Sequence, residues 1–146
     1  MKFKNEAVRD VLLFFEENID YEEDKHGELV KRKFYIDSII ENDFFKDLYE
    51  KHDYTKKELR YTIEKLIEGK ILQIHGDLNL YYEIVDISYD GLQLLSSIHD
   101  ESTWNKVKSV LKESGIYSLK YIGDVALQFG TTMVPKLVDK FITTQS

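Results

Sequence analysis

The chain has no cysteine among its 146 residues and only one proline. The lack of cysteine excludes a disulfide framework, a thiolate metal site and a cysteine nucleophile, and it fits a reducing compartment. No stretch approaches the roughly 18 consecutive apolar residues of a membrane-spanning helix. The opening MKFKNEAVRD also lacks the apolar core of a signal peptide. We therefore expect a cytoplasmic protein without a membrane partner.

Negative charge predominates, with a formal net charge of −7, and it is unevenly distributed. Residues 1–53 contain nine Lys and Arg against fifteen Asp and Glu, whereas residues 54–87 contain five against six and residues 88–146 six against six. The acidity is densest in Asp20–Asp24 (DYEED). This segment is either a solvated surface loop or a docking surface for a basic partner. Strong acidity disfavours non-specific nucleic-acid binding, whose affinity comes largely from neutralising phosphates.

The first 53 residues predict two helices joined by a polar loop. An apolar stripe marks the first helix, over Asn5–Asn18, with Phe14 beside the stripe and Asp10 on the opposite, polar side. Tyr21–Lys33 is polar and predicts a loop, followed by a short strand at Lys33–Ile36.

Two capping boxes, in which a Ser or Thr is followed three residues later by Glu, bracket a helix–turn–helix arrangement. Ser38 and Glu41 predict a helix over Ile39–Lys51, and Thr55 and Glu58 predict a helix over Lys56–Glu68. His52-Asp53-Tyr54 would form the turn between them. Gly69 is a typical residue to end the second of these helices.

Two strand-like segments follow, Ile71–Ile74 and Leu80–Ile87, with a turn at residues 75–79 that would form a wing. Ser88 can cap a further helix, Tyr89–Ile98. The predicted fold is therefore α+β and mainly helical. A winged helix-turn-helix core, residues 1–99, carries a C-terminal helical extension, residues 100–146, with helices expected at Thr103–Ser114, Ser118–Phe129 and Val134–Phe141.

Three segments resemble an uncharacterised family of short proteins from phages and prophages of Gram-positive bacteria. They read VRDVLLFFEEN, RYTIEKLIEGKIL and DISYDGLQLLSSIHDESTWNKVKSVLKESG. Ser88 replaces a threonine of the family pattern and keeps an N-cap oxygen, and Thr62 stands where the family tends to have histidine. The resemblance implies a winged-helix-like fold and a phage or prophage origin, and hence a location in the host cytoplasm.

One hypothesis for function is sequence-specific DNA binding by a transcriptional regulator. A winged helix usually places its third helix in the major groove, and the exposed side of Lys56–Glu68 would present Lys56, Lys57, Arg60, Tyr61 and Lys65. Against this, Glu64 lies four residues after Arg60 and can pair with it, and the predicted wing contains no Lys or Arg.

The preferred hypothesis is a protein–protein interaction module: an adaptor, co-regulator or inhibitor of a host protein. Ten tyrosines and an acidic segment favour protein interfaces. The candidate contact residues are Tyr21, Glu22, Glu23, Asp24 and Tyr61. Residues 118–141 could form a homodimer, or could pack on the first helix.

Catalysis finds no support in the sequence. The four histidines, His26, His52, His75 and His99, lack metal-ligand spacing and are interpreted as isolated surface residues. Phosphate-binding glycine motifs and the nucleophile-elbow motif are absent. We therefore expect a protein without a catalytic residue, cofactor or metal.

Overall fold

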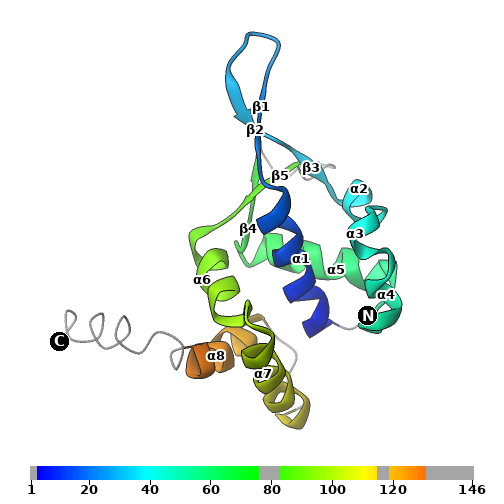
Figure 1. The fold of residues 1–146 in the computed structure, drawn as a ribbon, viewed down its shortest axis with the longest axis vertical. Coiled ribbons are helices and arrows are strands. Elements are labelled where there is room, and N and C mark those ends of the chain that lie inside the picture. The colour runs from blue at the N-terminus through cyan, green and yellow to red at the C-terminus, as the bar shows by residue number, and fades with distance from the viewer. Residues whose placement is uncertain (1–2, 76–82, 115–118, 131–146) are drawn as a thin grey trace, which may run out of the picture. The chain divides into compact units, whose positions relative to one another are not determined.

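The computed structural model describes residues 3–75, 83–114 and 119–130 (Figure 1). The chain divides into two compact units, unit 1 (residues 1–92) and unit 2 (residues 93–146). The secondary structure is α+β and mainly helical, as the sequence predicts. The division falls within one helix, and the predicted boundary at residue 99 remains a prediction.

Helix α1 (Asn5–Asn18) confirms the first predicted helix and supplies much of the core of unit 1. Its apolar stripe is buried at Val8, Val11, Leu12 and Phe15, and Phe14 belongs to the core as well. Four other aromatic rings, those of Phe15, Phe34, Phe44 and Phe45, have centroids 5.3–5.8 Å from that of Phe14. The prediction that Asp10 lies on a solvent-facing side is wrong, because Asp10 is only 2% exposed.

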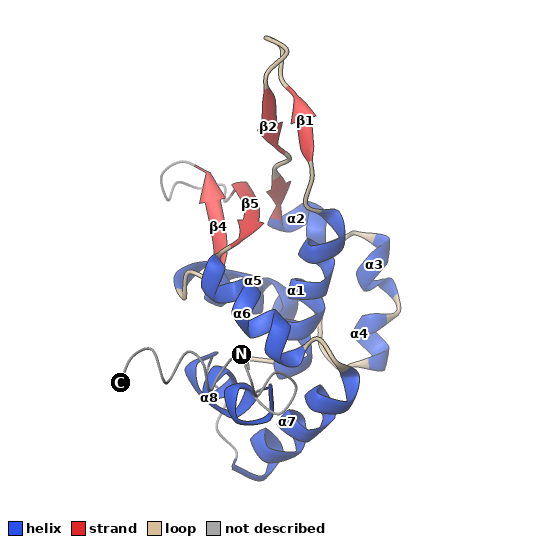
Figure 2. Ribbon diagram, turned by 60° about the vertical axis from the view of Figure 1, so that its left-hand side comes forward, coloured by secondary structure: helices blue, strands red, loops and turns tan. Residues whose placement is uncertain are grey.

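The segment predicted as a loop, Tyr21–Lys33, instead forms a β-hairpin. Strands β1 (Tyr21–Glu23) and β2 (Leu29–Lys31) pair antiparallel, and the hairpin projects from the rest of unit 1 (Figures 1 and 2). Asp24 closes its turn, since Oδ1 accepts hydrogen bonds from the backbone N–H groups of His26 (2.8 Å) and Glu28 (3.0 Å). Gly27 has φ +77°, which favours glycine. We call residues 21–31 the hairpin arm.

The predicted helix over Ile39–Lys51 is wrong in its extent and in its cap. Three short helices occupy the region: α2 (Ile36–Ile40), α3 (Asp43–Lys46) and α4 (Leu48–Lys51). Ser38 lies inside α2 and does not cap it. Asn42 restarts the helix, because its side chain accepts a hydrogen bond from the backbone N–H of Phe44 (2.9 Å).

Helix α5 (Lys56–Glu68) agrees with the predicted bounds, and its capping box is present. Thr55 Oγ1 accepts the N–H of Glu58 and Glu58 Oε1 accepts the N–H of Thr55, both at 3.1 Å. The residue in the left-handed region after the helix is Lys70 (φ +59°), whereas Gly69 has φ −77°.

A three-stranded antiparallel sheet with strand order β3-β5-β4 completes unit 1. It consists of β3 (Phe34–Tyr35), β4 (Leu72–His75) and β5 (Glu83–Ile87). His75, predicted as the first residue of the wing, lies in β4, whereas the rest of the predicted wing and the start of the predicted strand from Leu80 lie outside the described residues. Helix α6 (Tyr89–Ile98) follows, and Ser88 caps it as predicted, with its Oγ accepting the N–H of Gly91 at 3.1 Å.

In unit 2, α7 (Glu101–Ser114) packs against α8 (Leu119–Gly130). Helix α7 begins at Glu101 rather than Thr103 because Asp100 accepts the N–H of Thr103 (3.0 Å). Both helices bury apolar residues: Trp104, Val107 and Leu111 in α7, and Ile122, Val125 and Ala126 in α8. The predicted helix at 134–141, with part of the predicted dimer segment, lies outside the described residues. Among the described helices, none combines the length and apolarity needed to cross a bilayer.

Candidate functional site

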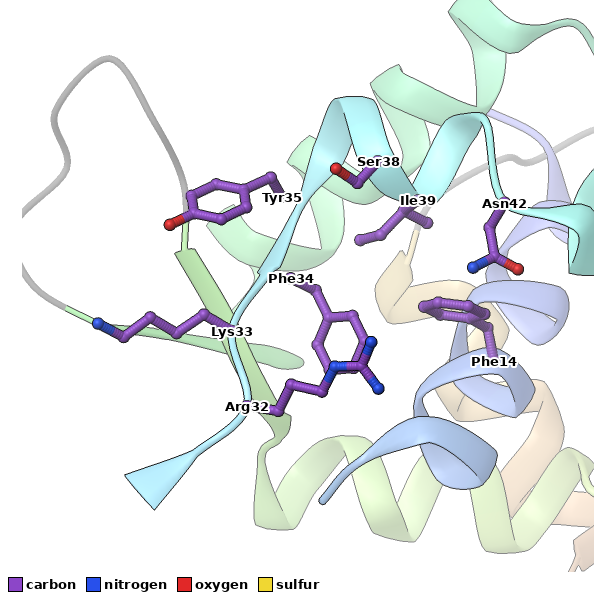
Figure 3. A pocket seen from close by; sticks show the side chains of 8 residues that line it. All are labelled: Phe14, Arg32, Lys33, Phe34, Tyr35, Ser38, Ile39 and Asn42. Carbon is purple, nitrogen blue, oxygen red and sulfur yellow. The ribbon is translucent and has the colours of Figure 1, made fainter. Parts of the chain in front are cut away.

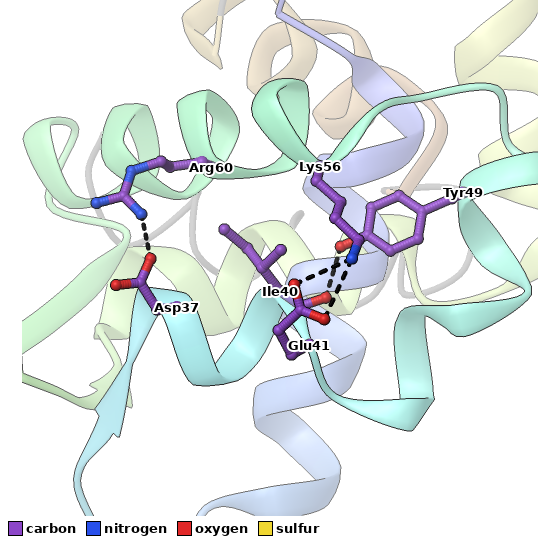
Figure 4. Close-up of polar contacts among 6 residues, drawn as sticks. All are labelled: Asp37, Ile40, Glu41, Tyr49, Lys56 and Arg60. Atoms are coloured by element: carbon purple, nitrogen blue, oxygen red, sulfur yellow. Dashed lines mark hydrogen bonds and ion pairs between the residues drawn. The ribbon is translucent and has the colours of Figure 1, made fainter.

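The cations predicted to bind DNA lie on the exposed side of α5, and carboxylates of the same chain pair with most of them. Figure 4 shows the pairs of Lys56 and Arg60 with the carboxylates beside α2. Lys56 bonds to both carboxylate oxygens of Glu41 at 3.0 and 3.1 Å. Arg60 contacts Asp37 at 2.5 Å and Glu64 at 3.3 Å. Lys65 Nζ lies 3.0 Å from Glu68 and 5.4 Å from the ring centroid of Tyr61.

This surface is electrically neutral in sum. Four cations (Lys56, Lys57, Arg60 and Lys65) stand against four carboxylates (Asp37, Glu41, Glu64 and Glu68). Each of these pairs is exposed and therefore weak, so a phosphate could replace a carboxylate. The displaced carboxylates would still repel the DNA backbone. Of the four cations, only Lys57 has no ion-pair partner within the described part of the chain.

The position of α2 brings two of these carboxylates to α5, because α2 packs on α5 with Asp37 and Glu41 on its outer side (Figure 4). Tyr49 fixes the end of α2 by donating a hydrogen bond from its hydroxyl to the carbonyl of Ile40 (2.7 Å). Burial, with a smaller contribution from Glu41, raises the pKa of Tyr49 to about 12, so the hydroxyl remains a donor at neutral pH.

The predicted acidic contact segment lies in the hairpin arm. The register pairs Tyr21 with Lys31 and Glu23 with Leu29, so these four side chains share one face, while Glu22 and Val30 share the other. The first face presents two large apolar side chains to solvent, since Tyr21 is 57% exposed and Leu29 is 70% exposed. The arm therefore combines apolar contact area with exposed carboxylates.

Two predicted contact residues have different surroundings. Asp24 is half-buried, and its carboxylate already accepts two backbone hydrogen bonds within the turn of the arm. Tyr61 lies on α5 beside Lys65, not in the arm. The structure thus groups Tyr21, Glu22 and Glu23 in one strand and places Tyr61 with the α5 cations.

The base of the arm is tied to the three-stranded sheet. Lys31, at the end of β2, bonds to Asp86 in β5, and this bond raises the pKa of the Lys31 ammonium. Lys33 Nζ lies 3.5 Å from a carboxylate oxygen of Glu83, which is also in β5. These two contacts join the end of the arm, and Lys33 just after it, to the central strand of the sheet.

The hairpin arm and the exposed side of α5 both lie within the part of the chain that matches a protein family. The family described as Hypothetical protein (DUF2513) matches residues 2–117, well over half of the chain. The chain belongs to the DUF2513 family. Comparisons with curated proteins and with solved structures gave no match. The matched range includes the hairpin arm and α5 and ends before α8, so the DUF2513 domain contains both candidate surfaces.

This DUF2513 chain also contains a buried polar network that the sequence does not indicate. His52 Nδ1 lies 2.6 Å from Asp10 Oδ2, and the hydroxyl of Tyr54 donates to the same oxygen at 2.9 Å. Tyr54 is 3% exposed. The prediction that His52 is an isolated surface residue is therefore wrong, and the network joins α1 to the turn before α5. Asp10 and His52 are 42 residues apart, so no local sequence pattern could have indicated that they form a pair.

Burial disfavours the charged carboxylate and raises the pKa of Asp10 above its ordinary value of 3.8, although His52 and Tyr54 act in the opposite direction. A carboxyl group with a raised pKa binds its proton more tightly in the folded chain. Its contribution to stability is full below the unfolded pKa and is lost as the pH rises through the folded pKa. The free energy of unfolding of the wild type, minus that of Asp10→Asn, should therefore fall as the pH rises above about 4.

Urea unfolding at a series of pH values measures this difference directly. Asp10→Asn keeps the size of the side chain and removes its titratable carboxyl group. It also replaces one acceptor oxygen with an NH₂ donor, so the test rests on how the difference changes with pH and not on its absolute value. A difference that stays constant or grows with pH would show that Asp10 does not titrate as its burial requires.

The described residues contain no group of three or more His, Asp or Glu side chains placed to hold a metal ion.

Proposed function

We propose that this DUF2513 protein is a non-enzymatic binding module that contacts another protein through its hairpin arm, on a winged-helix scaffold. The observation that carries the proposal is the exposure of Tyr21 and Leu29 on one face of a projecting arm. Exposed large apolar side chains on such an element are a marked feature of protein interfaces, in which tyrosine is enriched.

The order of elements supports the winged-helix scaffold. Helix α1 is followed by the hairpin arm (β1 and β2), and then by β3, the short helices α2–α4, helix α5 and the pair β4–β5. Strand β3 pairs with β5 at one edge of the sheet, and β4 pairs with β5 at the other. In this arrangement α5 takes the place of the recognition helix. The hairpin arm is then an insertion between α1 and β3.

The charges on the arm support a partner with a basic surface. Glu22 and Glu23 are exposed, and neither is needed for the turn, which uses Asp24 instead. Opposite charges across an interface speed association and select the partner. The resemblance to phage and prophage proteins makes a host protein in the host cytoplasm the proposed partner, with the module acting as an adaptor, co-regulator or inhibitor.

DNA binding through α5 is the weaker alternative. One observation favours it: Lys57, in the first turn of α5, is exposed and has no ion-pair partner within the described residues. The balanced charges around it weigh against this function, because DNA affinity depends on neutralising phosphates with an excess of cations.

A capture experiment with matched variants tests the proposal. The tagged protein is incubated with nuclease-treated lysate of the source organism, and retained proteins are quantified by mass spectrometry. Tyr21→Ser/Leu29→Ser should lower recovery of the specific partner by about tenfold or more, since truncating two central apolar contacts typically costs over 1.4 kcal/mol.

The control variant is Tyr89→Ser/Leu92→Ser, which removes the same two residue types from α6, where they are 73% and 49% exposed. It should leave recovery unchanged. Equal recovery by wild type and arm variant would remove the arm from the interface.

A further inference from the structure

A small cavity opens beside the base of the hairpin arm (Figure 3). It has a volume of about 200 Å³. The residues that line it come from α1, from the segment that follows the arm and from α2 with its C-terminal flank: Phe14, Arg32, Lys33, Phe34, Tyr35, Ser38, Ile39 and Asn42.

The size of the cavity decides what class of group it can hold. Sites for cofactors and drug-sized ligands usually measure about 300–1,000 Å³, so this one is too small for them. A cavity of about 150 Å³ is known to accept a benzene ring. Phe14, Phe34 and Ile39 supply an apolar wall. A single aromatic side chain of a partner therefore fits the cavity in size, and these three side chains give it an apolar contact.

Arg32 and Asn42 supply hydrogen-bond donors to the cavity, and Ser38 adds a hydroxyl that can donate or accept. The guanidinium of Arg32 lies 5.3 Å from the ring centroid of Phe34 and has no ion-pair partner among the described residues. Asn42 uses its amide oxygen to cap α3, which leaves its NH₂ group on the side of Ile39 (Figure 3). Lys33 and Tyr35 extend away from this side (Figure 3). Lys33 pairs with Glu83 of β5.

Among the described residues Arg32 has no ion-pair partner, whereas three cations of α5 are each paired with a carboxylate: Lys56, Arg60 and Lys65. Stacking on Phe34 holds the guanidinium at the cavity with its donors still available. A group that accepts hydrogen bonds and carries negative charge satisfies both Arg32 and Asn42. Because the donors of Arg32 and Asn42 lie beside the apolar side chains of Phe34 and Ile39, the cavity favours an aromatic group with a carboxylate next to it.

We propose that this cavity receives an aromatic side chain of the protein partner, and that an adjacent Asp or Glu of the partner pairs with Arg32. The inference rests on the proposed function and specifies the partner's chemistry: an acidic-aromatic segment at the base of the arm. The partner then presents opposite charges at two places, cations facing Glu22 and Glu23 and a carboxylate facing Arg32. This pattern fixes its orientation on the arm.

Two short peptides test the chemistry on the full chain without knowledge of the partner. They are a blocked Glu-Phe-Glu tripeptide and its Lys-Phe-Lys counterpart, and binding is followed through the NMR signals of the Ile39 methyl groups and the Phe34 ring. The net charge of −7 attracts the cationic peptide to the protein as a whole. A preference for the anionic peptide at Ile39 must therefore come from the local donors.

The acidic peptide should shift the Ile39 and Phe34 signals at millimolar concentration, with about tenfold higher affinity than the basic peptide. Arg32→Gln should remove this preference. Lys57→Gln, which removes another exposed cation without a described ion-pair partner, should keep it. Equal affinities, the absence of shifts, or a preference that survives Arg32→Gln would overturn the proposal.

A second copy of the chain is the competing occupant, because Tyr21 is followed by Glu22 and Glu23. Concentration-dependent shifts at Ile39 that disappear in both Tyr21→Ser and Arg32→Gln would assign the cavity to self-association and overturn the proposal. The peptide test is independent of the capture test. A cavity that binds neither peptide, with capture still dependent on the arm, would refute only the cavity.

Discussion

Phe14→Ala should lower the free energy of unfolding of unit 1 by about 3–5 kcal/mol, the usual cost of removing a buried phenylalanine. Phe14 is 1% exposed. Edge-to-face contacts with Phe15, Phe34 and Phe44 add to the cost of the cavity that remains. Because small domains are stable by only about 5–15 kcal/mol, the variant should be close to unfolding.

Urea unfolding followed by circular dichroism measures this loss, and Phe14→Leu serves as the control. Leucine keeps most of the apolar volume, so its cost should remain near 1.5 kcal/mol or below. The only tryptophan, Trp104, lies in unit 2, so its fluorescence reports on that unit separately. A loss below about 1 kcal/mol for Phe14→Ala would mean that the aromatic cluster is not the centre of the core.

Gly91→Ala should destabilise unit 1 by about 1–3 kcal/mol or more, the cost of forcing extra atoms into a packed site. A Cβ at Gly91 would lie 2.5 Å from both the carbonyl oxygen of Ile71 and Cγ2 of Ile87. The same carbonyl accepts the N–H of Ser88 (2.8 Å), so the backbone cannot move away without weakening that bond.

Gly123→Ala is the matched control, because Gly123 also lies within a helix but a Cβ there would meet no atom of the described residues within 4 Å. With no clash, the substitution should stabilise α8 by about 0.5–1 kcal/mol through helix propensity. Thermal unfolding of the two variants should therefore give shifts of opposite sign. A Gly91→Ala variant as stable as the wild type, or more stable, would contradict the close approach of α6 to Ile71.

The two capping boxes show how far local sequence could predict the fold. Thr55 and Glu58 begin α5 as predicted, whereas Ser38 and Glu41, with the same spacing, do not begin a helix. Phe34 and Tyr35 pair with β5, and the extended segment ends at Tyr35. Helix α2 therefore begins at Ile36, three residues before the predicted start at Ile39. Asn42, a stronger N-cap in this context, then interrupts the helix. The motif is local, and neighbouring contacts decide whether it is used.

The hairpin arm was missed because its strands lack the alternation of apolar and polar residues that marks a half-buried sheet. A signal was present in the turn: Asp24 and Gly27 stand at the first and fourth positions, where a type I turn favours Asp and Gly. An exposed arm needs no apolar face for a core, so only the turn residues could have indicated it.

The candidate surfaces were partly predictable. The i,i+4 pair of Arg60 with Glu64 follows from helix spacing and is confirmed. The partners that Asp37 and Glu41 provide to Arg60 and Lys56 come from another helix, so sequence spacing could not show them. The same limit hid the pairing of His52 with Asp10, since both depend on how helices pack.

Site-specific photo-crosslinking tests the central claim, a protein partner on the hairpin arm, most directly. The photoreactive residue p-benzoylphenylalanine would replace Leu29 in the arm, Lys57 on α5 or Leu92 on α6, in lysate of the source organism. All three positions are exposed, so reactivity alone does not favour one. We predict a discrete crosslinked protein from position 29 and none from position 92. Crosslinks confined to position 57, and to nucleic acid, would contradict the account and assign the function to α5.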